Sequence, residues 1–135
     1  MVKMREIKFR GRERVSNKWV FGYVRHWKCC YGDEWHIQGE NDNVHIVISE
    51  TIGQYTGLRD ANGQEIFEGD ILSNGRDTVV VSYSIEFAAF VGLYNGREDL
   101  VLNLDDCIDQ PLDELKLKVV GNVYDNPNLL EVTHD

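Results

Sequence analysis

Hydrophobic and polar residues alternate with a period of two along most of this 135-residue chain. Residues 5–10 alternate, with Ile7 and Phe9 on one face, and residues 18–27 carry large apolar side chains on both faces, which is typical of a central strand. Further strands are predicted at 35–38, 43–48, 70–74, 77–83, 87–104 and 117–125. About seven or eight short strands predict a mainly β protein, a small barrel or roll with additional β-hairpins and at most short helical segments.

Turn residues separate these predicted strands. Asn95-Gly96, between apolar runs, is the strongest hairpin signal, and Gly121 marks a β-bulge. Asn126-Pro127 begins a turn that can continue as one helical turn, and the acidic segment Asp105–Glu114 predicts a loop or a short helix.

Residues 56–71, TGLRDANGQEIFEGDI, could form a phosphate-binding loop, a catalytic elbow or a structural corner. A phosphate loop would lead its glycines into a helix, and a nucleophile elbow would place Ser or Cys at the turn. Neither pattern is present. Asp60–Gly63 instead matches a type I turn closed by glycine, and Glu68-Gly69-Asp70 forms a second corner. We therefore interpret the stretch as hairpin structure.

The length fits a single domain, residues 1–135. No run of 18 apolar residues and no signal-peptide core is visible, so we expect a cytoplasmic protein that does not insert into a membrane. Cys29, Cys30 and Cys107 are odd in number and two are adjacent, which predicts reduced thiols.

Charge is divided unevenly along the chain. Residues 1–28 carry nine basic and two acidic side chains, a formal +7, whereas the remainder carries five basic and 21 acidic, a formal −16. A basic head on an acidic body indicates either a polyanion-binding edge or attraction between the two parts, within one subunit or between subunits. A homo-oligomer is therefore one expectation, since an unpaired N-terminal strand could also add to a neighbour.

Four blocks of sequence carry a family resemblance: REIKFRG, KWVFGYV, IGQYTGLRDANGQEIFEGDI and VVGNVYDNPNLL. In this order, over nearly the whole chain, they resemble the YopX family of phage and prophage proteins. The resemblance implies a single YopX-like domain with an SH3-like β core at roughly residues 50–128 and an N-terminal β-hairpin region at 1–49. It implies no established enzymatic activity and supplies no catalytic residues.

The residues themselves form no catalytic or cofactor-binding constellation. His26, His36 and His45 could join Cys29 or Cys30 at a zinc ion, but no ligand pair repeats at metal-site spacing. The aspartates of the 105–114 segment lack the glycine and terminal glutamate of a calcium loop. We therefore expect a protein that is not an enzyme and requires no metal or cofactor.

Two binding hypotheses remain. The chain could bind a host or phage protein through exposed strand edges and its aromatic-rich strand, although large aromatics in a small β domain more often pack in the core. Alternatively, the basic N-terminal hairpin could bind nucleic acid, because alternate side chains of a strand share one face and can follow phosphates. The candidate partner-binding residues are Lys8, Arg10, Arg12, Arg14, Trp19, Arg25 and Trp27.

Overall fold

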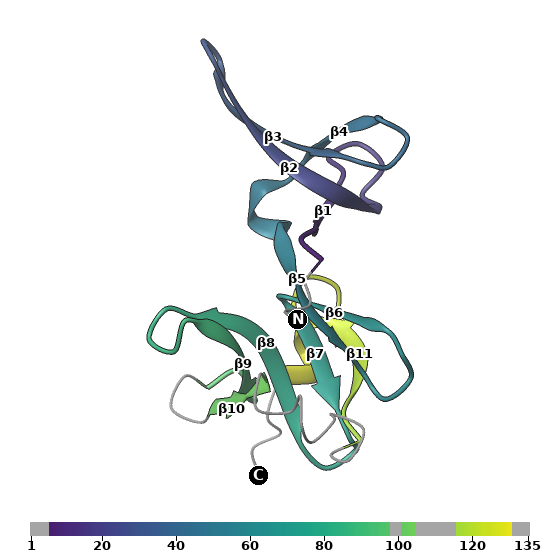
Figure 1. The fold of residues 1–135 in the computed structure, drawn as a ribbon, viewed down its shortest axis with the longest axis vertical. Helices are drawn as coiled ribbons and strands as arrows, with labels where there is room; N and C mark the ends of the chain where they lie inside the picture. Colours follow the sequence, from purple (N-terminus) through teal and green to yellow (C-terminus); the bar gives the residue numbers. More distant parts are fainter. Residues whose placement is uncertain (1–5, 98–100, 105–115, 131–135) are drawn as a thin grey trace, which may run out of the picture. The chain divides into compact units, whose positions relative to one another are not determined.

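The computed structural model describes residues 6–97, 101–104 and 116–130 (Figure 1). Within these ranges the regular elements are antiparallel β-strands and short 3-10 turns, so the prediction of a mainly β protein is confirmed. None of the described helical segments has the length and hydropathy to span a bilayer. The elements are β1 (Phe9–Arg12), β2 (Trp19–Cys29), β3 (Gly32–Gln38), β4 (Val44–Val47), η1 (Ser49–Thr51), β5 (Gly53–Arg59), β6 (Glu65–Phe67), β7 (Asp70–Ser73), β8 (Thr78–Ser84), β9 (Ala89–Tyr94), β10 (Val101–Asn103), β11 (Lys118–Asn122) and η3 (Pro127–Leu130).

The chain folds as two compact units that divide between Tyr55 and Thr56, inside β5. In the first unit the strand order is β4-β3-β2-β1-β5. In the second unit β6 lies beside β5, and a five-stranded sheet has the order β10-β9-β8-β7-β11.

The first unit curls until its first and fourth strands meet. The residues that follow β1 form an isolated antiparallel bridge and main-chain hydrogen bonds with the end of β4. Strands β1 to β4 therefore wrap around a small interior that contains Ile37, which is fully buried, and Val47. The contacts that close the ring are Glu13 with Val47, the Arg14 N–H to the Ile46 carbonyl at 2.9 Å, and the Ile48 N–H to the Arg12 carbonyl at 2.9 Å.

The second unit has the larger core. Its fully buried side chains come from β6, β7, β8 and β9 and from the residues that follow β10 and precede β11. This arrangement is consistent with the SH3-like roll that the family resemblance implies. The core residues are Ile66, Leu72, Val79, Val81, Phe90, Leu104 and Leu117, with Leu58, Tyr94, Leu102 and Val119 packed at their margin.

Asp60 organises the turn between β5 and β6. The Gly63 N–H donates to the Asp60 carbonyl at 2.9 Å and closes the predicted turn. The buried carboxylate accepts two further N–H groups, those of Asn62 at 2.8 Å and Gln64 at 2.9 Å, through Oδ1. Its Oδ2 accepts the N–H of Val119 in β11 at 2.9 Å. One carboxylate thus joins a local turn to a strand 59 residues away.

The corner at Glu68-Gly69-Asp70 is equally structural. Asp70 is 2% exposed, and its Oδ2 accepts the Phe67 N–H at 2.8 Å. Gly69 has φ 89°, in the region that favours glycine, and a Cβ there would lie 3.0 Å from the ring of Tyr124. The interpretation of residues 56–71 as hairpin structure is therefore supported at both corners.

Other local predictions were confirmed, with one exception. Asn95-Gly96 begins the connection between the paired strands β9 and β10, the register of β11 shifts at Gly121 as expected of a bulge, and Pro127–Leu130 forms a 3-10 turn. The exception is the strand predicted at residues 5–10. It begins only at Phe9, and Ile7, which we expected on the apolar face with Phe9, is 55% exposed. The acidic segment Asp105–Glu114, for which we predicted a loop or a short helix, lies outside the described residues.

Candidate functional site

The outward side of β2 presents a row of large side chains. Alternate residues of a strand point to the same side of the sheet, so Trp19, Phe21, Tyr23, Arg25 and Trp27 share one face, which we call the aromatic face. Phe21 is 48%, Tyr23 69% and Trp27 51% exposed, whereas Trp19 is half-buried. The expectation that the large aromatics pack in the core is therefore wrong for Trp27, whereas Trp19 and Trp35 are half-buried.

Two of the predicted basic residues join this face from β1. Arg10 pairs with Phe21 and Arg12 with Trp19, so both lie on the same side as the aromatic face. Their guanidinium carbons lie 4.6 and 4.7 Å from the centroid of the Trp19 ring, within the range of cation–π attraction. Arg12 also donates from Nη1 to the Asn17 carbonyl at 2.8 Å. Both cations are thus engaged inside the unit.

Burial separates the predicted basic residues further. Arg10 is only 7% exposed, although the alternation of its strand predicted a solvent-facing side chain. Its guanidinium lies against the Trp19 ring of the neighbouring strand, which contributes to this burial. Lys8 lies over the Tyr55 ring at 5.1 Å and forms an ion pair with Glu6 at 3.6 Å, whereas Arg14 and Arg25 are exposed. The predicted row of phosphate-facing cations is therefore not continuous.

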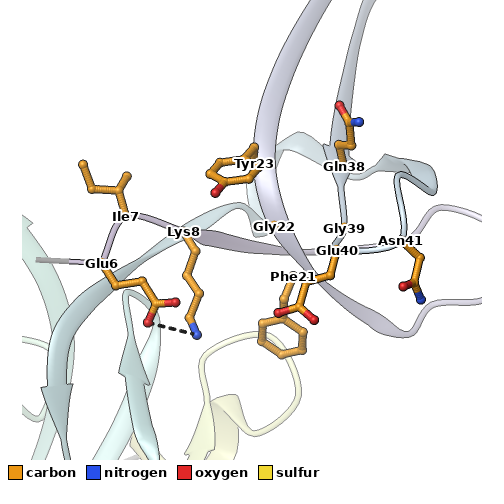
Figure 2. A pocket seen from close by; sticks show the side chains of 10 residues that line it. All are labelled: Glu6, Ile7, Lys8, Phe21, Gly22, Tyr23, Gln38, Gly39, Glu40 and Asn41. Carbon is orange, nitrogen blue, oxygen red and sulfur yellow. Dashed lines mark ion pairs between the residues drawn. The ribbon is translucent and has the colours of Figure 1, made fainter.

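A groove opens where the chain before β1 diverges from β2 (Figure 2). Its volume is about 480 Å³. Phe21 and Tyr23 supply aromatic walls, and Glu6, Lys8 and Glu40 supply charged groups around it. Gly22 lies at its base, where a Cβ would come within 2.0 Å of the Gln38 carbonyl oxygen, so the close approach of β2 and β3 requires glycine.

Beyond Gly22, strand β2 pairs with β3 alone, and we call this β2–β3 hairpin the ribbon. Its register places His26 opposite Trp35, and the rings stack with centroids 4.2 Å apart. The other side carries Trp27, which stacks on His36 at 6.5 Å. Figure 1 shows this ribbon as the long twisted hairpin of the first unit. Aromatic side chains therefore occupy both faces of the ribbon.

His26, His36 and His45 each lie beside a carboxylate and do not gather at one site. His26 Nε2 lies 3.4 Å from Asp33 and His36 Nε2 lies 3.0 Å from Glu34. His36 pairs with Ile46 whereas His45 pairs with Ile37, so His36 and His45 point to opposite sides of the sheet. In the described ranges, no three His, Cys, Asp or Glu side chains come close enough to hold a metal ion.

His45 instead supports the ring closure of the first unit. Its Nδ1 hydrogen bonds to the carboxylate of Glu13, next to the Glu13–Val47 bridge. Hydrogen bonds from Ser16 and then from His45 lower the pKa of Glu13 below its ordinary value. Glu13 therefore remains ionised. It holds His45 at the place where the residues after β1 meet β4, which we call the seam.

A second group of exposed apolar residues was missed by the sequence analysis. Tyr83 is 46%, Ile85 90% and Phe87 55% exposed at the hairpin between β8 and β9 in the second unit. A pocket of about 280 Å³ lies beside Tyr83 and Phe87. Apolar residues within a turn, where polar ones are usual, were the signal that could have identified this group.

Comparison with known proteins supports a family but no biochemical activity. A crystal structure of the protein EF1440 from Enterococcus faecalis is similar, with a TM-score of 0.54 and 24% sequence identity over 95% of this chain and 100% of that chain. At this identity the likeness shows the fold alone. No curated protein sequence matches the chain. The family model of the YopX protein matches residues 8–131, and this chain belongs to the YopX family.

Proposed function

We propose that this chain is a non-enzymatic accessory or regulatory protein of a bacteriophage or prophage, which binds a partner protein in the bacterial cytoplasm. The phage setting is what the family resemblance implies. The binding role is supported by the aromatic face, where Phe21, Tyr23 and Trp27 are each about half exposed or more. Monomeric proteins rarely leave such contiguous apolar side chains in solvent, and tryptophan and tyrosine are favoured anchors at interfaces.

The groove beside the aromatic face supports the same role. Phe21 and Tyr23 line it together with Glu6 and Glu40, so an apolar anchor of the partner would be flanked by carboxylates. Hydrophobic contact at the centre and charges at the rim is the usual anatomy of a protein interface. A partner segment with an apolar side chain and flanking basic residues fits this surface.

Nucleic-acid binding through the basic N-terminal hairpin is the alternative. Arg14, Arg25 and Lys28 are exposed and could contact phosphates. Two observations weigh against it: the burial of Arg10, and the charge up to Tyr55, where nine basic and seven acidic side chains leave a formal +2. Phosphate binding gains its affinity from many unshielded cations, so the protein partner is favoured.

Affinity capture from a host that carries the phage or prophage tests the proposal. We expect a discrete protein that survives nuclease treatment and is lost, by about tenfold or more, when Phe21 and Tyr23 are both changed to serine. The matched control changes Tyr83 and Ile85 to serine in the second unit and should retain the partner. Material that nuclease removes completely would favour nucleic acid, and equal capture by both variants would exclude the aromatic face.

A further inference from the structure

Strand β2 changes its pairing partner in the middle. Residues 19–22 pair with β1, whereas residues 23–29 pair with β3. From Tyr23 to Cys29 no strand in the described part of the chain pairs with the edge that β1 occupies earlier. The change occurs at Gly22, where the groove opens between this edge and residues 6–8. The ribbon therefore has a seven-residue edge that is open to another strand.

We propose that a second copy of this chain occupies this edge, so that residues 23–29 of two subunits pair antiparallel across a twofold axis. An unpaired strand edge is a template for a further strand, and a twofold contact uses the same surface of both subunits. This inference does not rest on the proposed function.

The sequence of the edge selects one register. Only alternate residues of an edge direct their N–H and C=O groups outward. Two antiparallel copies of the same edge therefore pair in registers in which one residue, the centre, lies opposite its own copy at the twofold axis. Centring on His26, the midpoint of 23–29, is the register that uses the whole edge. Centring on Arg25 would place two guanidinium groups directly opposite each other, and like charges in that position destabilise a strand pair.

The register centred on His26 also makes favourable side-chain pairs. It places Arg25 of each copy opposite Trp27 of the other, which creates two cation–π contacts per dimer. Both side chains are exposed in the single chain and lie on the aromatic face. Lys28 comes opposite Val24, so no like charges meet there. The edge is therefore complementary to itself in this register.

Edge pairing leaves the aromatic face of the ribbon accessible. The aromatic faces of two subunits would lie side by side on one sheet, and one partner could contact both. Backbone hydrogen bonds carry the contact, so dimerisation should persist at high salt, unlike an association driven by the exposed charges alone.

Site-specific crosslinking tests the register in the full chain, after Cys29, Cys30 and Cys107 are changed to serine. With His26→Cys, two thiols face each other at the axis, and a thiol-reactive linker of about 8 Å should give a covalent dimer. In Val24→Cys the two thiols are four residues apart along the paired strands, roughly 14 Å, so this variant alone should form no covalent dimer. A mixture of Val24→Cys with Lys28→Cys should crosslink again. Efficient crosslinking of Val24→Cys alone, or none of His26→Cys in folded protein, would overturn the register.

A residue exchange tests the same contact without new cysteines. Trp27→Arg should weaken the dimer by about tenfold or more, because it places two arginines opposite each other on each side of the axis. Adding Arg25→Trp to this variant restores the complementary pair and should recover the native association. Sedimentation equilibrium at low and high salt measures all three proteins, and Tyr31→Ser, at the exposed end of the ribbon, is the control. A native chain that stays monomeric up to roughly 300 μM, or a double variant no better than Trp27→Arg, would refute the proposal.

Discussion

Replacing Asp60 tests how the second unit is held together. The Asp60→Asn variant keeps one carbonyl oxygen for the N–H groups of Asn62 and Gln64, but it turns an amide group toward the N–H of Val119. The variant therefore loses the connection to β11 while the local turn remains. Asp60→Ala loses all three hydrogen bonds.

The magnitudes follow from the burial of this carboxylate, which is 7% exposed. One lost charge-assisted hydrogen bond should lower the free energy of unfolding by about 1–2 kcal/mol in Asp60→Asn. Three lost bonds and a buried unpaired N–H should lower it by about 3–5 kcal/mol in Asp60→Ala. With a urea m-value of about 1.5 kcal/mol/M, the midpoints should fall by roughly 1 M and 2–3 M.

Urea titration followed by circular dichroism measures these shifts, with Asp77→Asn as a control because Asp77 is exposed in the same unit. Hydrogen exchange at the Val119 amide gives a second readout, and its protection should fall in both Asp60 variants. If Asp60→Asn and Asp60→Ala were equally destabilised, the connection to β11 would account for the whole effect and the local turn for none. A native midpoint in Asp60→Asn would refute the reasoning altogether.

Three further predictions concern the corners, the seam and metal content. Gly69→Val should lower the free energy of unfolding by about 2–4 kcal/mol and Gly63→Val by only about 1–2 kcal/mol. The reason is that a Cβ at position 69 meets Tyr124, whereas nothing lies within 4 Å of a Cβ at position 63. Equal melting temperatures for the two variants would contradict this. Because the pKa of Glu13 is lowered in the folded chain, its contribution to stability should be present above its ordinary value of about 4.5 and should disappear as the pH falls through the lowered pKa. Glu13→Gln should therefore differ from the native chain at pH 7 and converge with it in acid, and a constant difference would count against the seam contact. Purified protein should contain no stoichiometric zinc, and its melting temperature should not change when a chelator is added. Stoichiometric zinc in the native chain that is lost in His36→Ala would contradict this prediction.

Local chemistry made the turns predictable. Asp60–Gly63, Asn95-Gly96 and the bulge at Gly121 depend on neighbouring residues and backbone conformation, and each was recognised from the sequence. The strands predicted at 35–38 and 43–48 were likewise recognised, and they correspond to β3 and β4, which pair antiparallel.

The burial of individual side chains could not be predicted, because it depends on which strands pair in the folded chain. Alternation indicates which side chains share a face but not which face meets solvent, so the burial of Arg10 and the exposure of Trp27 depended on the partner strands. Similarly, the alternation of residues 18–27 does not indicate that position 22 needs glycine. Its requirement comes from the Gln38 carbonyl, which approaches from 16 residues away in the sequence.

The ring closure of the first unit imposes an order on its folding. Strand β1 depends on residues far along the chain: the segment after it bonds to Ile46, the Arg12 N–H donates to Thr51 Oγ1 at 2.9 Å, and the Lys8 carbonyl accepts from Tyr55. The hairpins β1–β2, β2–β3 and β3–β4 need only short loops, so they should form first, because loop-closure entropy delays distant contacts. A nascent chain on the ribosome must expose residues up to Tyr55 before the first unit can close. Until then, the edge of β1 that later pairs with β5 stays open, and the growing chain carries an unprotected strand edge.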